Sequence, residues 1–239
     1  MPGQPVDPGQ PVGPGQPVDP GQPVDPGQPV GPGQRVDAVV FDLGGVLIDW
    51  DPRYVYRPLF ADPAEMEDFL ARVCSTDWHR ANDLGADITQ SCRRLAAAHP
   101  RYEEMIMVWA ERSEEMAAGQ FDATVTVLGE LKAAGLRCYA LSNMEPDAFT
   151  TRRARFPFME WFDGHVISGI EGVAKPDRRI FELLLRRYGL QPGATVFVDD
   201  SPGNVEAARA LGIVALQYTS AHRLRQDLRA LGLPLRRLR

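Results

Sequence analysis

The chain has 239 residues and a formal net charge of −6 at pH 7, and 24% of its residues are charged. Because several of the acids lie in or beside an N-terminal repeat, the remainder is close to charge balance, which gives no support for a nucleic-acid-binding surface. No apolar run approaches the length of a membrane span and no signal peptide opens the chain, so we expect no membrane partner. The three cysteines are scattered and have no metal-ligand spacing, which favours a reducing compartment, the cytoplasm.

Residues 1–37 repeat the unit PGQPV(D/G) with a period of six. Proline fixes the backbone and removes donors, glycine loosens it, and valine is the only apolar side chain of each unit. Such a segment buries too little surface to offset its ordering entropy, so we predict that it is disordered and partly polyproline II. A passive extension is the favoured interpretation, ahead of a spacer or a ligand for a polyproline-binding module.

The first predicted strand, AVVF at 38–41, ends in a bare carboxylate, Asp42, which is followed closely by Gly44 and Gly45. An acid at the tip of a buried strand is unfavourable unless something there uses it. The two glycines allow a sharp turn and a close approach of the backbone to a ligand. Asp42 is therefore a candidate functional residue, with helix capping as its alternative.

After this strand the pattern becomes helical only, in the segments PAEMEDFLARV, ITQSCRRLAAAH and RYEEMIMVWAERSEEMAAG. We interpret 52–119 as an all-α insert of three or four helices. The insert interrupts a core that is made of 38–51 and 120–239. Trp78 and Trp109 are predicted to fill the interior of the insert.

Four more apolar, β-rich runs follow the insert, and helical patterns separate several of them. Strands that are nearly apolar on both faces and alternate with helices indicate a parallel sheet covered on both sides, an α/β fold. Ligands of such sheets bind at the carboxyl ends of the strands. The runs are RCYAL (137–141), HVIS (165–168), TVFV (195–198) and IVALQY (213–218), and the helical patterns are TVTVLGELKAAG, DRRIFELLLRRYG and NVEAARALG.

Polar residues gather where these strands end. Ser142 and Asn143 follow the second strand, and Asp199 and Asp200 follow the fourth. Lys175, in AKPD, lies on the loop before the third crossover helix. Each signal is weak alone, because an Asp after a strand is often a helix cap and KPD is an ordinary loop. Together with the acid after the first strand, they predict one catalytic crevice.

These segments resemble the four motifs of the haloacid dehalogenase superfamily of hydrolases, in VVFDLGGVL, YALSN, the lysine of KPD and FVDDSPGNVEAARALG. The resemblance spans roughly 37–220, and the helical insert is similar to the cap that one large branch carries between motifs one and two. It implies a Rossmann-like core, an aspartate nucleophile at Asp42 and a covalent aspartyl intermediate. Most members of the superfamily are Mg²⁺-dependent phosphatases, and a minority are metal-free 2-haloacid dehalogenases.

The resemblance also implies a role for each matching residue, and the chemistry of the side chains fits. A carboxylate is already ionised at neutral pH and needs no base to act as a nucleophile. A lysine, a serine hydroxyl and backbone N–H groups balance and hold the oxygens of an anionic phosphoryl group. The expected catalytic residues are Asp42, Ser142 and Lys175; the expected substrate-binding residues are Leu43, Gly44, Asn143 and Arg53; and the expected Mg²⁺ ligands are Asp42, the backbone carbonyl of Gly44, Asp199 and Asp200.

Gly44 departs from the family pattern, because most of the phosphatases carry a second Asp there as the general acid for the leaving group. A halide leaves without a proton, so the glycine suits a dehalogenase. The paired acids Asp199 and Asp200 favour a phosphatase, because like charges about 4 Å apart repel by ~4 kcal/mol at an effective dielectric of about 20 and Mg²⁺ removes that repulsion. We therefore expect a Mg²⁺-dependent phosphohydrolase of a small phosphorylated metabolite such as a sugar phosphate. A dehalogenase and a catalytically weak binding protein are the alternatives.

Without the motif-one acid, turnover is predicted to depend steeply on the pKa of the leaving group, unless another residue supplies the proton. His79, Asp83 and Asp49 are the candidates for that residue, and packing within the cap is the favoured role of His79. Arg53 either contacts a substrate anion or opens the first cap helix. The sequence names neither the physiological substrate nor the oligomeric state.

Overall fold

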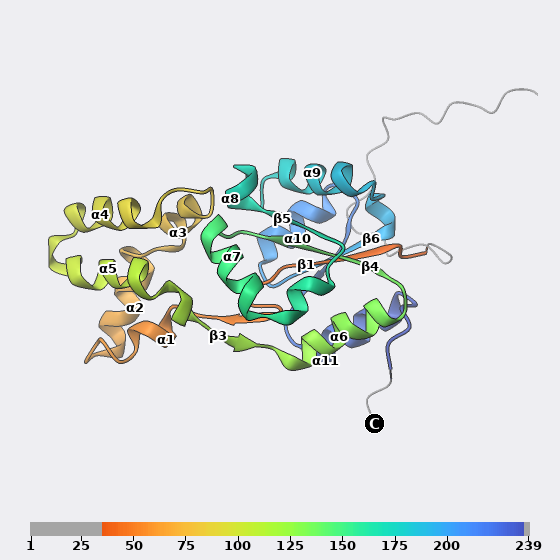
Figure 1. The fold of residues 1–239 in the computed structure, drawn as a ribbon, viewed down its shortest axis with the longest axis horizontal. Helices are drawn as coiled ribbons and strands as arrows, with labels where there is room; N and C mark the ends of the chain where they lie inside the picture. Colours follow the sequence, from red (N-terminus) through yellow and green to blue (C-terminus); the bar gives the residue numbers. More distant parts are fainter. Residues whose placement is uncertain (1–34, 237–239) are drawn as a thin grey trace, which may run out of the picture.

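A parallel β-sheet forms the centre of the computed structural model, which describes residues 35–236 (Figure 1). The disorder predicted for 1–37 falls outside the described residues, except at 35–37. The five strands lie in the order β5-β4-β1-β6-β7, and all neighbours are parallel, which confirms the predicted α/β, Rossmann-like fold class. The strands are β1 (Ala38–Phe41), β4 (Arg137–Ser142), β5 (Gly164–Ile167), β6 (Thr195–Asp199) and β7 (Val214–Gln217).

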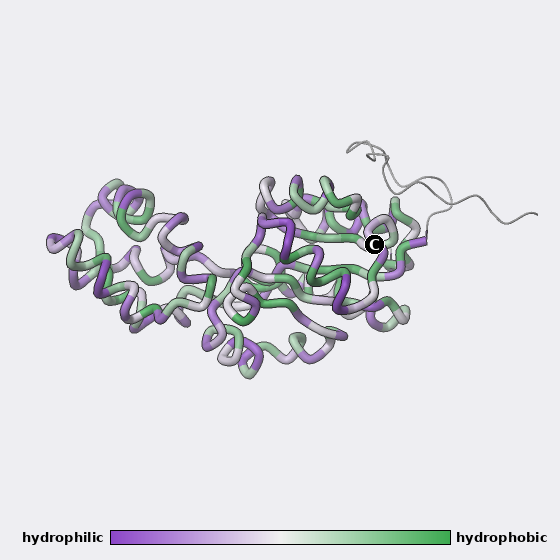
Figure 2. Tube along the Cα trace, turned by 90° about the horizontal axis from the view of Figure 1, so that it is seen from above, coloured by the Kyte–Doolittle hydropathy of each residue, from purple (hydrophilic) through white to green (hydrophobic). Residues whose placement is uncertain are grey.

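Different helices cover the two faces of the sheet, because successive side chains of a strand point to opposite sides. In β1, Val39 and Phe41 pack on one face, and Ala38 and Val40 pack on the other. Figure 1 shows the two helical layers on opposite sides of the sheet, and Figure 2 shows the apolar strands running between them. The covering helices are α6 (Asp122–Ala133), α7 (Pro146–Arg155) and α11 (Ala221–Ala230) on the first face, and α9 (Arg178–Tyr188) and α10 (Pro202–Arg209) on the second.

Helices α6, α9 and α10 coincide with the predicted helical segments. In α9 the side chain of Asp177 accepts a hydrogen bond from the N–H of Arg179 at the start, and Gly189 ends the helix with φ +60°. The sequence analysis missed α7, α11 and the one-turn helix α8 (Ser168–Glu171); α7 buries only three of its ten side chains, too weak a stripe to recognise. Within residues 35–236, no helix has the length and apolar character that crossing a membrane requires.

Five α-helices between β2 and β3 form a second cluster, which we call the cap (Figures 1 and 2). Its core is aromatic: Tyr56, Phe69 and Trp109 are buried, and Trp78 packs edge-on against Trp109 with ring centroids 5.2 Å apart. The sequence predicts only three or four helices, because α1 and α3, with four and seven residues, are too short to show a helical period. The cap helices are α1 (Arg53–Tyr56), α2 (Pro63–Arg72), α3 (Thr76–Asn82), α4 (Ile88–Ala98) and α5 (Glu103–Arg112).

A short antiparallel pair joins the cap to the core. β2 (Ile48–Trp50) and β3 (Ala117–Gln120) pair with each other and not with the parallel sheet. The chain therefore leaves the core and returns to it through adjacent strands. The sequence predicts neither strand, because three and four residues are too few to show alternation, and the residues AAG of β3 were expected to be helical.

Candidate active site

Asp42 lies at the carboxyl end of the central strand β1. Its backbone N–H donates to the carbonyl oxygen of Val198 in β6 (2.8 Å), which holds the residue between two strands. Its Oδ1 accepts hydrogen bonds from the N–H of Leu43 (2.7 Å), Oγ of Ser142 (2.9 Å) and Nζ of Lys175 (2.9 Å). Oδ2 receives no hydrogen bond from residues 35–236. One carboxylate oxygen is thus held in place and the other is left for chemistry.

Lys175 reaches the same point from the loop before α9. Its side chain is 1% exposed, and Nζ contacts Asp42 Oδ1 (2.9 Å), Asp199 Oδ2 (2.7 Å) and the carbonyl oxygen of Leu141 (2.9 Å). Burial alone would lower the pKa of Lys175, but the charges of Asp42 and Asp199 outweigh it and the pKa is raised. Asn143 fixes the lysine backbone, because its amide donates to the Lys175 carbonyl oxygen and accepts from the Lys175 N–H, both at 2.9 Å.

Asp199, at the end of β6, is a fully buried anchor. Its Oδ1 accepts from the N–H of Ser201 (2.9 Å), and both oxygens accept from the side-chain amide of Asn204 (3.0 and 3.2 Å). Oδ2 also holds Lys175. The sequence analysis did not single out Asn204. The signal that would have found it is an amide in the first turn of the helix that follows an acidic strand end.

Asp200 is exposed, and no side chain of the residues that the structure describes donates a hydrogen bond to its carboxylate. Partial burial and the neighbouring charge of Asp199 raise its pKa. Gly45 lies directly beside it with φ +72°, and a Cβ there would be 2.5 Å from Asp200 Oδ2. The positive φ favours glycine at 45, and a larger residue would also push the Asp200 carboxylate aside. At Gly44, in contrast, φ is not positive and a Cβ would meet only Trp50 Cβ, at 4.0 Å.

Asp42, Asp199 and Asp200 each bring one carboxylate oxygen within 4.8 Å of the others. Among the described residues, the ammonium of Lys175 is the cation that touches this group, so negative charge is in excess. Burial raises the pKa of Asp42 to about 7; Lys175 opposes this, and the charges of Asp199 and Asp200 add to it. A divalent cation would relieve the excess, and carboxylate oxygens are donors that Mg²⁺ prefers. The residues present therefore fit a Mg²⁺ ion.

A cavity of about 370 Å³ opens between this crevice and the cap, within the size range of about 300–1,000 Å³ that is usual for small-molecule sites. Leu43 and Asp199 do not line it: the N–H of Leu43 is used by Asp42, and Asp199 lies behind Lys175. The predicted site residues that do line it are Asp42, Gly44, Arg53, Ser142, Asn143, Lys175 and Asp200.

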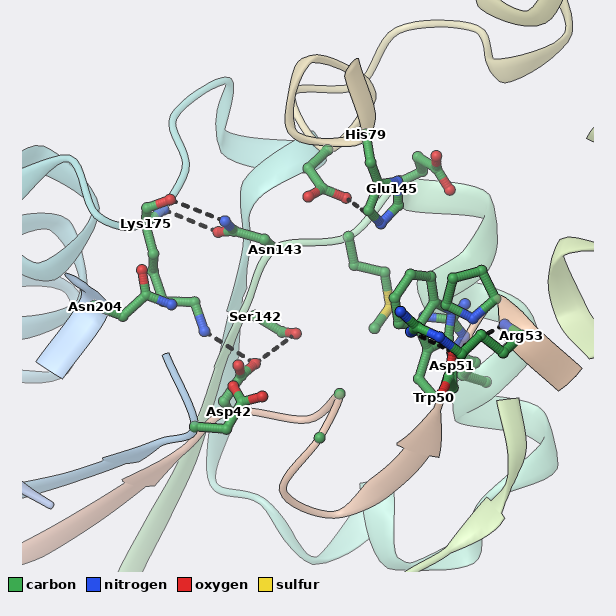
Figure 3. A pocket seen from close by; sticks show the side chains of 17 residues that line it. Asp42, Trp50, Asp51, Arg53, His79, Ser142, Asn143, Glu145, Lys175 and Asn204 are labelled. Atoms are coloured by element: carbon green, nitrogen blue, oxygen red, sulfur yellow. Dashed lines mark hydrogen bonds and ion pairs between the residues drawn. The ribbon is translucent and has the colours of Figure 1, made fainter. Parts of the chain in front are cut away.

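The cap and the segment leading into it form the opposite wall. Figure 3 shows His79 descending from the cap above the loop of Asn143, with Trp50 and Arg53 on another side of the cavity. The rings of Trp50 and His79 stack, with centroids 5.1 Å and planes 7° apart. Burial and the charge of Arg152 lower the pKa of His79 to about 4, so its ring is neutral at pH 7.

Arg53 lines the cavity and is also the first residue of α1. Its guanidinium is already paired: Nε and Nη2 each donate to Glu67 at 2.7 Å, and Nη1 donates to Asp51 at 3.2 Å. These bonds use three of the five N–H donors of the guanidinium, so one N–H on each terminal nitrogen is left for a substrate anion. Substrate binding by Arg53 therefore stays a prediction, and its observed contacts are those of a residue that opens the helix.

Asp83, at the end of α3, brings a cap carboxyl to the cavity. Its side chain is 7% exposed, and its Oδ1 lies 3.8 Å from His79 Nε2. Ser168 Oγ donates to the backbone carbonyl oxygen of Asp83 and accepts from the N–H of Met144 (2.9 Å), so the cap rests on the core at this point. Burial is the main cause that raises the pKa of Asp83 to about 7, and the charge of Glu145 adds to it.

A second group of charges lies at the same junction and also lines the cavity. Arg152 of α7 is buried, and its Nε has no hydrogen bond among the described residues; Glu114 Oε1 is 3.9 Å away. Burial lowers the pKa of Arg152 and raises that of Glu145. The sequence analysis missed both residues, because they lie in a strongly polar segment that gives no sign of burial.

Residues 36–212 match a family model described as "Hydrolase: haloacid dehalogenase-like hydrolase". Sesquiterpene phosphatase astK of Aspergillus oryzae is 29% identical over 209 residues, which cover 81% of this chain and 95% of that protein. Three further curated relatives that match most of both chains are also named as phosphatases. Two other relatives are much longer, and this chain spans 12% and 36% of them.

Solved structures of two kinds share the fold. An L-2-haloacid dehalogenase from Xanthobacter autotrophicus with chloropropionic acid covalently bound has a TM-score of 0.57 and 20% identity, over 84% of this chain and 85% of that one. The enzyme bt-2542 from Bacteroides thetaiotaomicron, in complex with magnesium and inorganic phosphate, has a TM-score of 0.54 and 19% identity, over 77% and 94%. At this identity the structures show the fold and do not separate the two chemistries.

Proposed function

Since the chain belongs to the haloacid dehalogenase-like hydrolases, we propose that it is a Mg²⁺-dependent phosphohydrolase that acts on a small phosphorylated metabolite through an aspartyl-phosphate intermediate. The observation that carries the proposal is the convergence of Asp42, Asp199 and Asp200 around the buried ammonium of Lys175. The phosphatase relatives support the same reaction class.

Asp42 is the proposed nucleophile. Because Oδ1 is held by three donors, Oδ2 attacks phosphorus while the bond from phosphorus to the leaving oxygen breaks. Water then attacks the phosphoryl group on Asp42, which releases inorganic phosphate and restores the carboxylate. Lys175 and Ser142, whose donors already lie beside Asp42, balance the charge of the transferred oxygens.

Asp42, Asp199 and Asp200 would hold the Mg²⁺ ion, and the backbone carbonyl of Gly44 is the predicted further ligand. When bound, the ion supplies positive charge that offsets the repulsion between these carboxylates and an anionic phosphoryl group. A cation held there would also lower the pKa of Asp42 and favour its ionised form at neutral pH.

The wall of the cavity opposite Asp42 indicates which substrates fit. Beyond the phosphate site it presents the carboxyl groups of Asp51, Asp83 and Glu145 and the neutral ring of His79. Carboxyl groups and a neutral imidazole both form hydrogen bonds with the hydroxyl groups of a substrate. We therefore propose sugar and polyol phosphates as the substrates to test first.

Gly44 favours one alternative, a metal-free 2-haloacid dehalogenase, because a halide leaves without a proton. The excess of carboxylates at the crevice argues against it, since a haloacid substrate is itself an anion. A binding protein without catalysis is disfavoured by the contacts of Asp42, which leave Oδ2 available as a nucleophile.

Phosphate release from p-nitrophenyl phosphate, with Mg²⁺ or with EDTA, tests the proposal beside chloride release from 2-chloropropionate. We expect phosphate release only with Mg²⁺, and its loss in Asp42→Asn. Asp77→Asn is the matched control, because this side chain is 95% exposed on α3. Chloride release in EDTA would show that the protein is a dehalogenase. If neither phosphate nor chloride is released, the binding-protein alternative would be favoured.

The division of the chain into a core and an insert at 52–119 is also a proposal. It is supported by the separate aromatic core of the cap and by the β2–β3 pair at the point of entry and return. A reducing, cytoplasmic compartment is proposed because Cys74, Cys92 and Cys138 are all buried free thiols.

A further inference from the structure

The proposed reaction needs a proton for the leaving oxygen, and Gly44 cannot supply it. An alkoxide is a poor leaving group, so a group with a removable proton is needed within the cavity. Within the part of the chain that the structure describes, four cavity-lining side chains carry a carboxyl or imidazole group and are not expected metal ligands. They are Asp51, His79, Asp83 and Glu145.

Asp51 and His79 do not meet this need. Asp51 Oδ1 is engaged as an acceptor, from the N–H (2.8 Å) and Nη1 (3.2 Å) of Arg53. His79 has a pKa of about 4, so it carries no excess proton at neutral pH. Asp49, the third candidate from the sequence, lies outside the cavity and accepts a hydrogen bond from Tyr54 Oη (2.9 Å).

Glu145 lines the cavity beside Arg152 of the core. The charges that act on it are those of Arg152, Glu114 and Asp147, and Arg152 opposes the effect of burial on its pKa. Neither Asp42 nor a metal ligand is among these neighbours. A proton on Glu145 is therefore poorly placed for an oxygen that departs from the phosphoryl group on Asp42.

Asp83 lines the cavity, and the charges of Lys175 and Asp42 at the reacting centre act on its carboxyl. Its carboxyl is nearly buried, and no lysine or arginine of residues 35–236 lies within ion-pair distance of it. Burial and the charge of Glu145 outweigh the opposing charges of Lys175 and Arg152, and a pKa of about 7 leaves a large protonated fraction at neutral pH. The charged and titratable groups that face it are Asp42, Lys175, Glu145 and Arg152 from the core, and His79 from its own helix.

The backbone of Asp83 is fixed by the core. Ser168 donates to its carbonyl oxygen and accepts from Met144, which belongs to the loop after β4. The next turn packs directly on α8: Gly85 has φ +92°, and a Cβ there would lie 2.6 Å from the carbonyl oxygen of Gly169. The position of this cap carboxyl is thus set by contacts with the domain that carries the nucleophile.

We propose that Asp83 is the general acid for the leaving group and replaces the side chain that Gly44 lacks; this inference rests on the proposed phosphatase function. In the first step Oδ2 of Asp42 bonds to phosphorus, the bond to the leaving oxygen breaks, and the carboxylic proton of Asp83 moves to that oxygen, which departs as a neutral alcohol. In the second step Asp83, now a carboxylate, takes a proton from the attacking water while the bond from phosphorus to Asp42 breaks. Inorganic phosphate leaves, and Asp83 is protonated again.

A leaving-group series with Mg²⁺ present tests this, from p-nitrophenyl phosphate through phenyl phosphate to glycerol phosphate. The wild type should show a shallow dependence of kcat on leaving-group pKa. Asp83→Asn should lose about 10²–10³-fold on glycerol phosphate and no more than about threefold on p-nitrophenyl phosphate, whose leaving group needs no proton. A steep wild-type series, or equal losses on all substrates in Asp83→Asn, would overturn the inference.

Two further variants sharpen the result. Glu145→Gln removes the half-buried carboxyl of the same wall and should keep the wild-type slope. Gly44→Asp places a carboxyl where the structure has room for a Cβ, so in the Asp83→Asn background it should restore the shallow slope. A double variant as steep as Asp83→Asn alone would show that a missing acid is not the defect.

Carboxyl ¹³C NMR of the metal-free protein supplies a readout that does not depend on turnover. We expect a carboxyl that titrates near pH 7 and disappears in Asp83→Asn; Asp42→Asn identifies the other group expected in this range. An Asp83 signal that titrates near pH 4 would overturn the inference and leave the phosphatase proposal intact. Absence of wild-type phosphate release from p-nitrophenyl phosphate would instead defeat the phosphatase proposal itself.

Discussion

Ser168 Oγ donates a hydrogen bond to the backbone carbonyl oxygen of Asp83 and so ties the cap to the first turn of α8 in the core. Both residues are buried, at 0% and 5% exposure. The same hydroxyl accepts from the N–H of Met144, two residues after Ser142, which is a hydrogen-bond partner of the proposed nucleophile. One buried side chain therefore fixes the proposed proton donor relative to the nucleophile.

Ser168→Ala should lower the free energy of unfolding by about 1–3 kcal/mol, because it leaves a buried N–H and a buried carbonyl group unpaired. It should also steepen the leaving-group dependence of kcat, with little change in KM for p-nitrophenyl phosphate. In the Asp83→Asn background it should add no further steepening, since no acid is left to misplace. Urea unfolding and the leaving-group series measure the two effects. An equal loss of kcat on every substrate would show that Ser168 has only a structural role.

The stability of the metal-free protein should depend on pH through Asp83. Its folded-state pKa of about 7 lies above the ordinary value of 3.8, so between these values the folded state holds a proton that the unfolded state has released. Stability therefore falls as pH rises through this window. In EDTA at pH 8, Asp83→Asn should be more stable than the wild type by on the order of 4 kcal/mol, and the difference should close toward pH 4.

Urea unfolding at several pH values measures this difference. Asp77→Asn, on the same helix but 95% exposed, is the control and should follow the wild-type pH dependence. A stability difference between Asp83→Asn and the wild type that stays constant from pH 4 to pH 8 would contradict the raised pKa.

Lys175→Met should destabilise the protein by about 3–5 kcal/mol at pH 8, because it leaves the carboxylates of Asp42 and Asp199 buried without their partner. Lys132→Met is the matched control. The Lys132 side chain pairs with Asp163 at 2.6 Å but is 27% exposed, so its loss should cost no more than about 1 kcal/mol. Denaturant unfolding of the two variants checks the contrast, and similar losses would argue against a buried ion-pair network.

Asp200 and Asp199 should respond differently to neutralisation. No side chain of the described residues donates to the exposed carboxylate of Asp200, so Asp200→Asn should weaken Mg²⁺ binding by about tenfold or more with little change in unfolding. Asp199 holds Lys175 and Asn204, so Asp199→Asn should also lower the free energy of unfolding by about 1–3 kcal/mol. Titration calorimetry and urea unfolding separate the two. The assignment fails if Asp200→Asn binds Mg²⁺ as the wild type does.

Gly45→Ala should lose Mg²⁺ affinity as well as stability, because the added Cβ would collide with Asp200 Oδ2 at 2.5 Å. Gly135→Ala is the control for backbone strain alone, since Gly135 has φ +81° but open space around a Cβ. Both variants should lose stability, and only Gly45→Ala should lose affinity in calorimetry. Unchanged Mg²⁺ binding in Gly45→Ala would show that the carboxylate can move aside.

The strands of the sheet could be predicted from the sequence because each is buried on both faces, and the motif residues could be placed because parallel strands present their carboxyl ends at one edge. β2 and β3 could not, since two strands of three and four residues carry no readable period. The helix α7 is long enough to show a helical period, but its segment is strongly polar, and one of its few buried side chains is the charged Arg152. The sequence therefore does not predict it.

The core half of the site was predictable, because Asp42, Ser142 and Lys175 follow recognisable strands and loops and the structure joins them by direct contacts. The cap half was not. Nothing local distinguishes Asp83 from a surface acid at the end of a short helix. Its burial comes from the packing of the turn after it on α8, a contact between segments about 85 residues apart in the chain.

The β2–β3 pair makes the cap separable from the core, because the chain enters and leaves the cap through these two adjacent strands. Because Trp50 and Ala117 are partners in that antiparallel pair, a tight hairpin between them would bypass the entire cap without breaking a rung of the parallel sheet. The nucleophile would survive such an excision, whereas Asp83 and His79 would go with the excised lobe. Exchange of that lobe alone would therefore replace the wall that the cap contributes to the cavity and leave the crevice around Asp42 as it is.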